Sequence, residues 1–191
     1  PYHSAGRLAS PSALVRTRSG GPRHNITDGV PVVGATMSLN VSQSFCTPTD
    51  MRTGTVKAVG THIILMEDNS NPSGGFSTAQ YDSIAATFDT LVFPAVAGEF
   101  GAPFDIDSNS RVIALYTAAV NDLTPPASSS YVGGFFYSRD LFSTGSCAGS
   151  NEGEMFYMLV PDSTGVVNGN SRTKSFVLQV TVGTIAHEYQ H

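Results

Sequence analysis

The last stretch of the chain, from Ser171 to His191, constrains the fold more than any other. It contains no proline and a single glycine, Gly183. So long a stretch without a helix breaker predicts a helix over residues 171–191. Its many β-branched residues are only moderate helix formers, and they are typical of a helix that is buried on most of its sides.

This predicted helix ends in His187-Glu188-Tyr189-Gln190-His191. Two histidines four residues apart lie on the same helix face, one turn apart, so their imidazoles can bind one Zn²⁺. Glu188 is placed to take a proton from a water on the metal and to pass it to a leaving amine. This spacing is typical of zinc metallopeptidases. The sequence thus predicts His187 and His191 as metal ligands and Glu188 as the catalytic base and acid.

Upstream, short apolar segments alternate with loops and one further amphipathic pattern. Apolar residues at helical spacing predict a helix over residues 78–93, which Pro94 kinks or ends. The segment 131–137 is predicted to be a strand or a loop. Gly60 is predicted to mark either a bulge or the break between two strands. Mixed strands and helices favour an α+β fold with helices packed on one sheet. The predicted strands are a pair within 32–41, then 55–59, 62–66, 111–116 and 154–160.

Composition excludes several classes of protein. Of 191 residues, 13% are charged and the net charge is −5. So few charges exclude a coiled coil, and the scattered basic residues argue against nucleic-acid binding. No apolar run is long enough to span a membrane. The low charge is typical of a secreted protein, which we expect to be a monomer. Residues 1–29 are predicted to be a flexible arm or a propeptide remnant.

Cys46 and Cys147 are the only two cysteines. In an oxidising compartment they can close a loop of about 100 residues by a disulfide. Two free buried thiols are the alternative.

The segment after Phe104 has the spacing of a calcium-binding loop. Asp105, Asp107 and Asn109 offer oxygens at the first, third and fifth positions. The glycine and the distal glutamate of such a loop are absent, so a hydrogen-bonded turn before a buried strand is the simpler interpretation. We keep Ca²⁺ as a second candidate metal beside Zn²⁺.

The segment from Thr184 to His191 resembles the active-site helix of the hyicolysin-like zinc metallopeptidases, in the gluzincin branch of the zincins. Residues 104–113, 131–137 and 150–157 are similar to segments of secreted bacterial members, so the resemblance covers about 53–191. It implies a secreted bacterial endopeptidase. It also implies a zincin-like catalytic subdomain with a twisted mixed sheet, two main helices and the active-site helix at its C-terminus.

A gluzincin takes its third zinc ligand, a glutamate, from a helix downstream of the second histidine. This sequence ends at His191. The resemblance therefore implies that residues 30–191 form the upper half of a zincin-like domain, and that this fragment alone is inactive.

The strand at 154–160 lies about 30 residues before the zinc helix, where an edge strand of a zincin pairs with substrate. We therefore expect Met155, Phe156, Tyr157 and Met158 to bind a peptide or protein substrate; an ordinary core strand is the alternative. His62 has no nearby partner in sequence and is expected to be structural. The competing function is a non-catalytic secreted binding or adhesion domain whose His pair is incidental.

Overall fold

The computed structural model describes residues 29–191. The predicted arm, residues 1–29, lies outside the described residues except for Gly29. The elements in chain order are β1 (Thr36–Asn40), β2 (Met51–Val59), β3 (Ile63–Asp68), α1 (Thr78–Thr87), a π-helical turn η2 (Phe88–Val92), α2 (Phe93–Phe100), β4 (Val112–Tyr116), α3 (Ala118–Asp122), β5 (Gly134–Phe136), a 3₁₀ turn η3 (Ser138–Leu141), β6 (Met155–Met158) and α4 (Lys174–Glu188).

The strands form one mixed sheet in the order β1-β2-β3-β4-β6-β5. Its centre, β3, β4 and β6, is parallel, while β1, β2 and β5 add antiparallel neighbours at the two sides. The parallel strands are buried on both faces, as the continuous apolar runs in the sequence predict. The predicted α+β class with a mixed sheet is confirmed.

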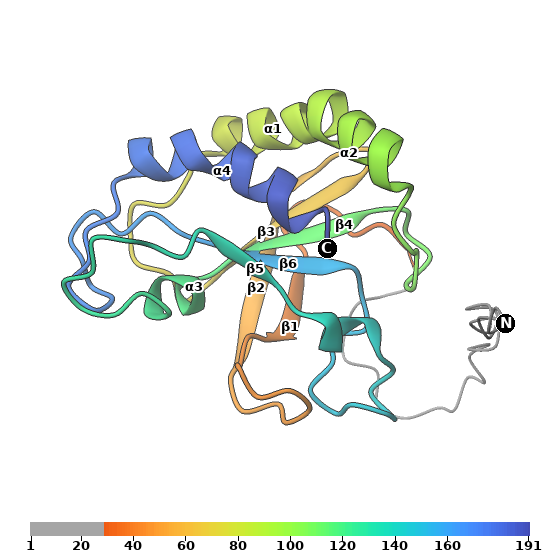
Figure 1. Cartoon of the computed structure of the whole chain (residues 1–191), viewed down its shortest axis with the longest axis horizontal. Coiled ribbons are helices and arrows are strands. Elements are labelled where there is room, and N and C mark those ends of the chain that lie inside the picture. The colour runs from red at the N-terminus through yellow and green to blue at the C-terminus, as the bar shows by residue number, and fades with distance from the viewer. Residues whose placement is uncertain (1–28) are drawn as a thin grey trace, which may run out of the picture.

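Helices α1, α2 and α4 lie on one side of this sheet (Figure 1). On this face, helix α1 packs on β2 and β3, whereas α4 packs on β5 and β6, toward the edge of the sheet that β5 forms. Ser77 caps α1 by accepting a hydrogen bond from the Gln80 amide, and the Gln80 side chain accepts one in return from the Ser77 amide. In the described residues no helix is long and apolar enough to cross a membrane.

The helix predicted over 78–93 continues past Pro94 to Phe100, so its predicted end is wrong. The π-helical turn from Phe88 to Val92 separates α1 from α2. Pro94 then falls in the first turn of α2, where its missing N–H costs no intrahelical hydrogen bond.

One strand prediction also needs correction. Residues 32–41 give one strand, β1, which pairs with β2 rather than with a second strand of its own. Gly60 lies in the turn between β2 and β3, so the predicted break between two strands is confirmed, and the register shift of this pair lies between Val56 and Ala58 instead. Helix α4 begins three residues later than predicted, because Thr173 caps it by accepting a hydrogen bond from the Phe176 amide. It ends three residues earlier than predicted, at Glu188.

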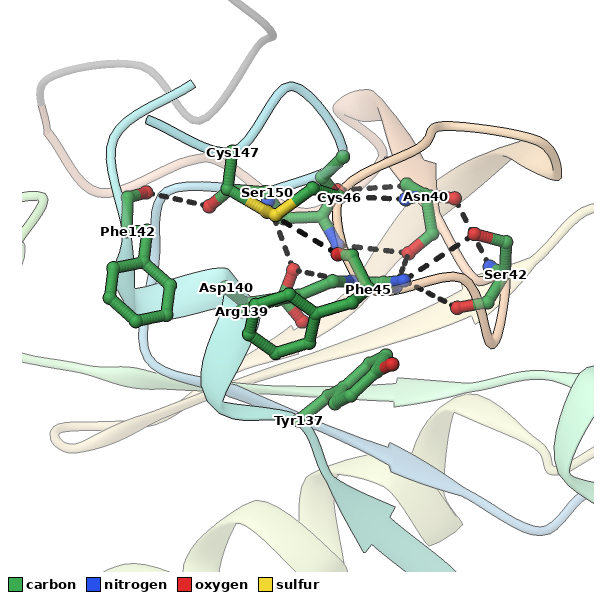
Figure 2. A network of polar contacts seen from close by, with 12 residues as sticks. Asn40, Ser42, Phe45, Cys46, Tyr137, Arg139, Asp140, Phe142, Cys147 and Ser150 are labelled. Atoms are coloured by element: carbon green, nitrogen blue, oxygen red, sulfur yellow. Dashed lines mark hydrogen bonds and ion pairs between the residues drawn. A yellow bond between two sulfur atoms is a disulfide. The ribbon is translucent and has the colours of Figure 1, made fainter. Parts of the chain in front are cut away.

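Cys46 and Cys147 form a disulfide in the structure, across a sequence separation of 101 residues. It joins the loop after β1 to the long connection between β5 and β6 (Figure 2). These two segments are far apart in the chain, so the cross-link restricts the unfolded ensemble strongly.

We predict that the double substitution Cys46→Ser and Cys147→Ser lowers the free energy of unfolding by about 4–5 kcal/mol. The reason is the restored entropy of the open loop in the unfolded chain. Urea unfolding measures the change, with reduced wild-type protein as the control. Equal stability of the oxidised protein and the variant would contradict the prediction.

Candidate metal centre

One face of α4 is buried against the sheet. Its buried residues are spaced by four, four and three positions, which places them on one side of a helix: Val177, Thr181, Ile185 and Glu188. Thr181 Oγ1 shares a hydrogen bond of 2.8 Å with the Tyr116 hydroxyl of β4. This contact fixes the rotation of the helix, so Glu188 is turned toward the sheet while His187 is exposed.

Strand β5 passes directly beside the end of α4. A Cβ added at Gly134 would lie 2.8 Å from the Tyr157 carbonyl oxygen, 2.9 Å from Thr184 Cγ2 and 3.2 Å from Glu188 Cγ. A backbone atom and a helix thus close the space from both sides, and only glycine fits without displacing one of them. No local pattern around Gly134 connects this glycine with the histidine motif more than 50 residues later in the sequence.

His187, Glu188 and His191 each offer one ligand atom, and these atoms lie within 4.8 Å of one another. His191 follows the end of α4, but the backbone remains helical at Tyr189, and the His191 amide donates to the Glu188 carbonyl at 3.2 Å. The imidazole ring centres of the two histidines are 5.2 Å apart. The predicted site residues are therefore brought together although the helix is shorter than expected.

The two kinds of side chain differ in their exposure. His187 and His191 are exposed, whereas Glu188 is buried. Burial raises the pKa of the Glu188 carboxyl, against the lowering effect of both histidines and of a hydrogen bond from the Phe136 amide. The His191 ring also stacks on the Phe136 ring, with 6.2 Å between centres. Exposed imidazoles beside a buried carboxylate can bind a metal ion that remains open to solvent.

The substrate-edge prediction for residues 155–158 is wrong. Strand β6 lies between β4 and β5, and all four of its residues are buried. Its backbone groups are occupied on both sides, so it is the core strand of the alternative interpretation. The outer strand on this side is β5, because the connection after Phe136 folds β6 back between β5 and β4. Distance along the sequence could not reveal this order.

The calcium loop is only partly as predicted. Asp105 and Asp107 form a group of carboxylates with Glu154, with one oxygen of each within 4.8 Å of the others. The Asn109 side chain is occupied within its own loop, since it donates to Asp107 at 2.6 Å and accepts from the Arg111 amide at 2.6 Å.

His62 stacks on Phe93, with 3.6 Å between ring centres, and does not join the group at His187.

A buried polar network holds the connection between β5 and β6 in place (Figure 2). Arg139 is fully buried and donates to backbone carbonyls of Asn40 and Ser44, at 2.8 and 2.7 Å, and also to that of Ser42. Asp140 accepts from the Tyr157 hydroxyl at 2.7 Å. Burial raises the pKa of the Asp140 carboxyl, while these donors oppose the rise. The network ties β6 to β1, across the sheet from α4.

No protein-family model matches the chain. The chain is 31% identical, over 156 residues, to the neutral metalloprotease ShpI of Staphylococcus hyicus. The chain is related to a metalloprotease. The match covers 80% of this chain and 33% of ShpI, so the chain spans about a third of that relative's length.

We predict that Gly134→Ala lowers the free energy of unfolding by about 1–3 kcal/mol, because its Cβ meets the Tyr157 carbonyl and α4. Gly183→Ala is the matched control. Gly183 is an exposed helix glycine with nothing within 4 Å of an added Cβ, so this change is neutral or stabilising by up to about 1 kcal/mol. Denaturant unfolding of both variants measures the difference, and equal effects would contradict the proposed packing constraint.

Proposed function

We propose that this protein is a secreted zinc endopeptidase. The observation that carries the proposal is the group of His187, Glu188 and His191 at the outer strand of the sheet. The similarity to a metalloprotease supports it independently of the geometry. The disulfide supports secretion, since such bonds persist in oxidising compartments.

The donor chemistry of the group fits Zn²⁺. Zinc prefers imidazole nitrogen, and His187 and His191 offer two such ligands with their rings exposed. In residues 29–191 no further histidine, cysteine or carboxylate belongs to this group. We therefore expect the third protein ligand of a catalytic zinc site from a segment outside these residues. When bound, zinc supplies Lewis acidity toward the scissile carbonyl and lowers the pKa of water.

Glu188 is the proposed general base and then general acid. It lies between the two histidines in sequence, and one of its carboxylate oxygens is within 4.8 Å of a ligand nitrogen of each. The Phe136 amide donates a hydrogen bond to this carboxylate and so orients it. Burial raises its affinity for a proton, which favours accepting one from the attacking water and releasing it to the leaving amine.

The proposed substrate site is the outer edge of β5. This strand has a partner, β6, on one side only among the described strands. An extended peptide can add a strand to such an edge through main-chain hydrogen bonds. Phe136 belongs to this strand and contacts His191, so a peptide bound there would lie beside the metal ligands.

We predict that Glu188→Gln lowers peptide hydrolysis by about 10²–10⁴-fold while zinc stays bound. His187→Ala should instead lose the zinc, because the site then lacks one of its imidazoles. Casein hydrolysis and zinc content by mass spectrometry measure both effects, on the longest natural chain that contains this segment.

Gln190→Ala is the control, since Gln190 is exposed in the same turn and outside the ligand group. It should leave both activity and zinc content unchanged. Full activity of Glu188→Gln would overturn the catalytic role. Absence of zinc from wild-type protein resupplied with Zn²⁺ would favour a binding domain with an incidental motif.

A further inference from the structure

Three carboxylates from two distant segments meet at the start of the parallel strands β4 and β6. Asp105 and Asp107 lie in the loop between α2 and β4, and Glu154 directly precedes β6. Because these strands are parallel neighbours, with Ile113 opposite Met155, their N-terminal ends lie side by side. One oxygen of each carboxylate lies within 4.8 Å of the others.

Glu154 is the unusual member of this group. It is 7% exposed. Its Oε1 accepts a hydrogen bond from the Ile106 amide, but Oε2 is buried without a hydrogen-bond partner in the described part of the chain. A buried carboxylate oxygen that lacks a partner is costly, and the neighbouring aspartates add like-charge repulsion. A bound cation would give Oε2 a partner and would offset the repulsion between the carboxylates.

The nearest basic side chain of the loop is directed elsewhere. Arg111 donates from Nε to the Gly60 carbonyl at 2.8 Å and from Nη1 to the Asn109 carbonyl at 2.7 Å. Its guanidinium therefore stabilises the backbone of the loop. The loop itself is tightly bent, since Ser108 and Ser110 both have positive φ. This bend directs Asp105 and Asp107 toward the start of β6.

We propose that Asp105, Asp107 and Glu154 form a structural Ca²⁺ site that is separate from the histidine group. Oxygen ligands favour a hard cation over zinc. Calcium–oxygen distances of about 2.3–2.6 Å put ligands on opposite sides of the ion about 4.6–5.2 Å apart. The three donor oxygens lie within 4.8 Å of one another, so none of them is too far from the others to share one such ion. Asp105 is exposed, so water can complete the coordination shell.

Such an ion would connect the loop before β4 with the first residue before β6. The Ile113 amide already donates to the Glu154 carbonyl at 2.8 Å, so the two segments are in register there. Strand β6 pairs with β5, and β5 contacts α4. The proposed ion would thus stabilise the strands on which α4 packs, and it would do so without contacting the histidine group.

The test is thermal unfolding of the zinc-loaded protein with and without added CaCl₂. At ten times the Kd, Ca²⁺ should raise the midpoint by about 3–6 °C. Glu154→Gln keeps the size of the side chain and should abolish this shift. Glu99→Gln, at an exposed position of α2 outside the group, should retain the full shift.

Asp105→Asn gives a second measurement if Glu154→Gln fails to fold. Asp105 is exposed, and an amide oxygen can still accept from the Asn109 and Ser110 amides, so the loop should persist. Its Kd for Ca²⁺ should rise at least about tenfold. No shift in wild-type protein, an unchanged shift in both variants, or an equal shift with MgCl₂ would overturn the proposal. His187→Ala should retain the shift, which separates this test from that of the zinc site.

Discussion

Strand β5 reaches the end of α4 because position 134 carries no side chain. The Tyr157 carbonyl on one side and Thr184 and Glu188 on the other leave no room for a Cβ. Two turns before Glu188 on the same helix face, Thr181 is joined to Tyr116 by a hydrogen bond. These contacts fix both the height and the rotation of α4 above the sheet. The direction of Glu188 follows from them.

The polar network at Arg139 fixes the position of β6 and of the connection between β5 and β6 by joining them to the end of β1. A fully buried arginine is stable only when its donors are satisfied, and here backbone carbonyls of residues 40–44 accept from it. The disulfide joins the same two segments by a covalent bond. The pairing of β5 with β6 therefore has support from outside the sheet. The proposed Ca²⁺ site would add a third support, at the start of β6.

Local patterns predicted the local elements well. The continuous apolar runs predicted strands at the centre of the sheet, and the helical spacing of apolar residues predicted the start of α1. Errors arose at element ends, where tertiary contacts decide. The π-helical turn at Phe88–Val92 allowed the helix to pass Pro94, and no local signal marks such a turn. Asn109 was a reasonable oxygen ligand by spacing, but its side chain is used by the turn itself.

By itself, the sequence determined the residues of the candidate zinc site, since the four-residue spacing of His187 and His191 is a property of helical backbone and needs no other segment. It also determined the α+β class through its periodicities. The tertiary structure alone decided which strand lies at the outer edge and which carboxylate faces Asp105 and Asp107. Both depend on contacts between segments far apart in the chain: β5 against α4, and Glu154 against a loop some 50 residues earlier. Strand order and long-range packing leave no periodic trace in one sequence, because they result from how all the elements share one core.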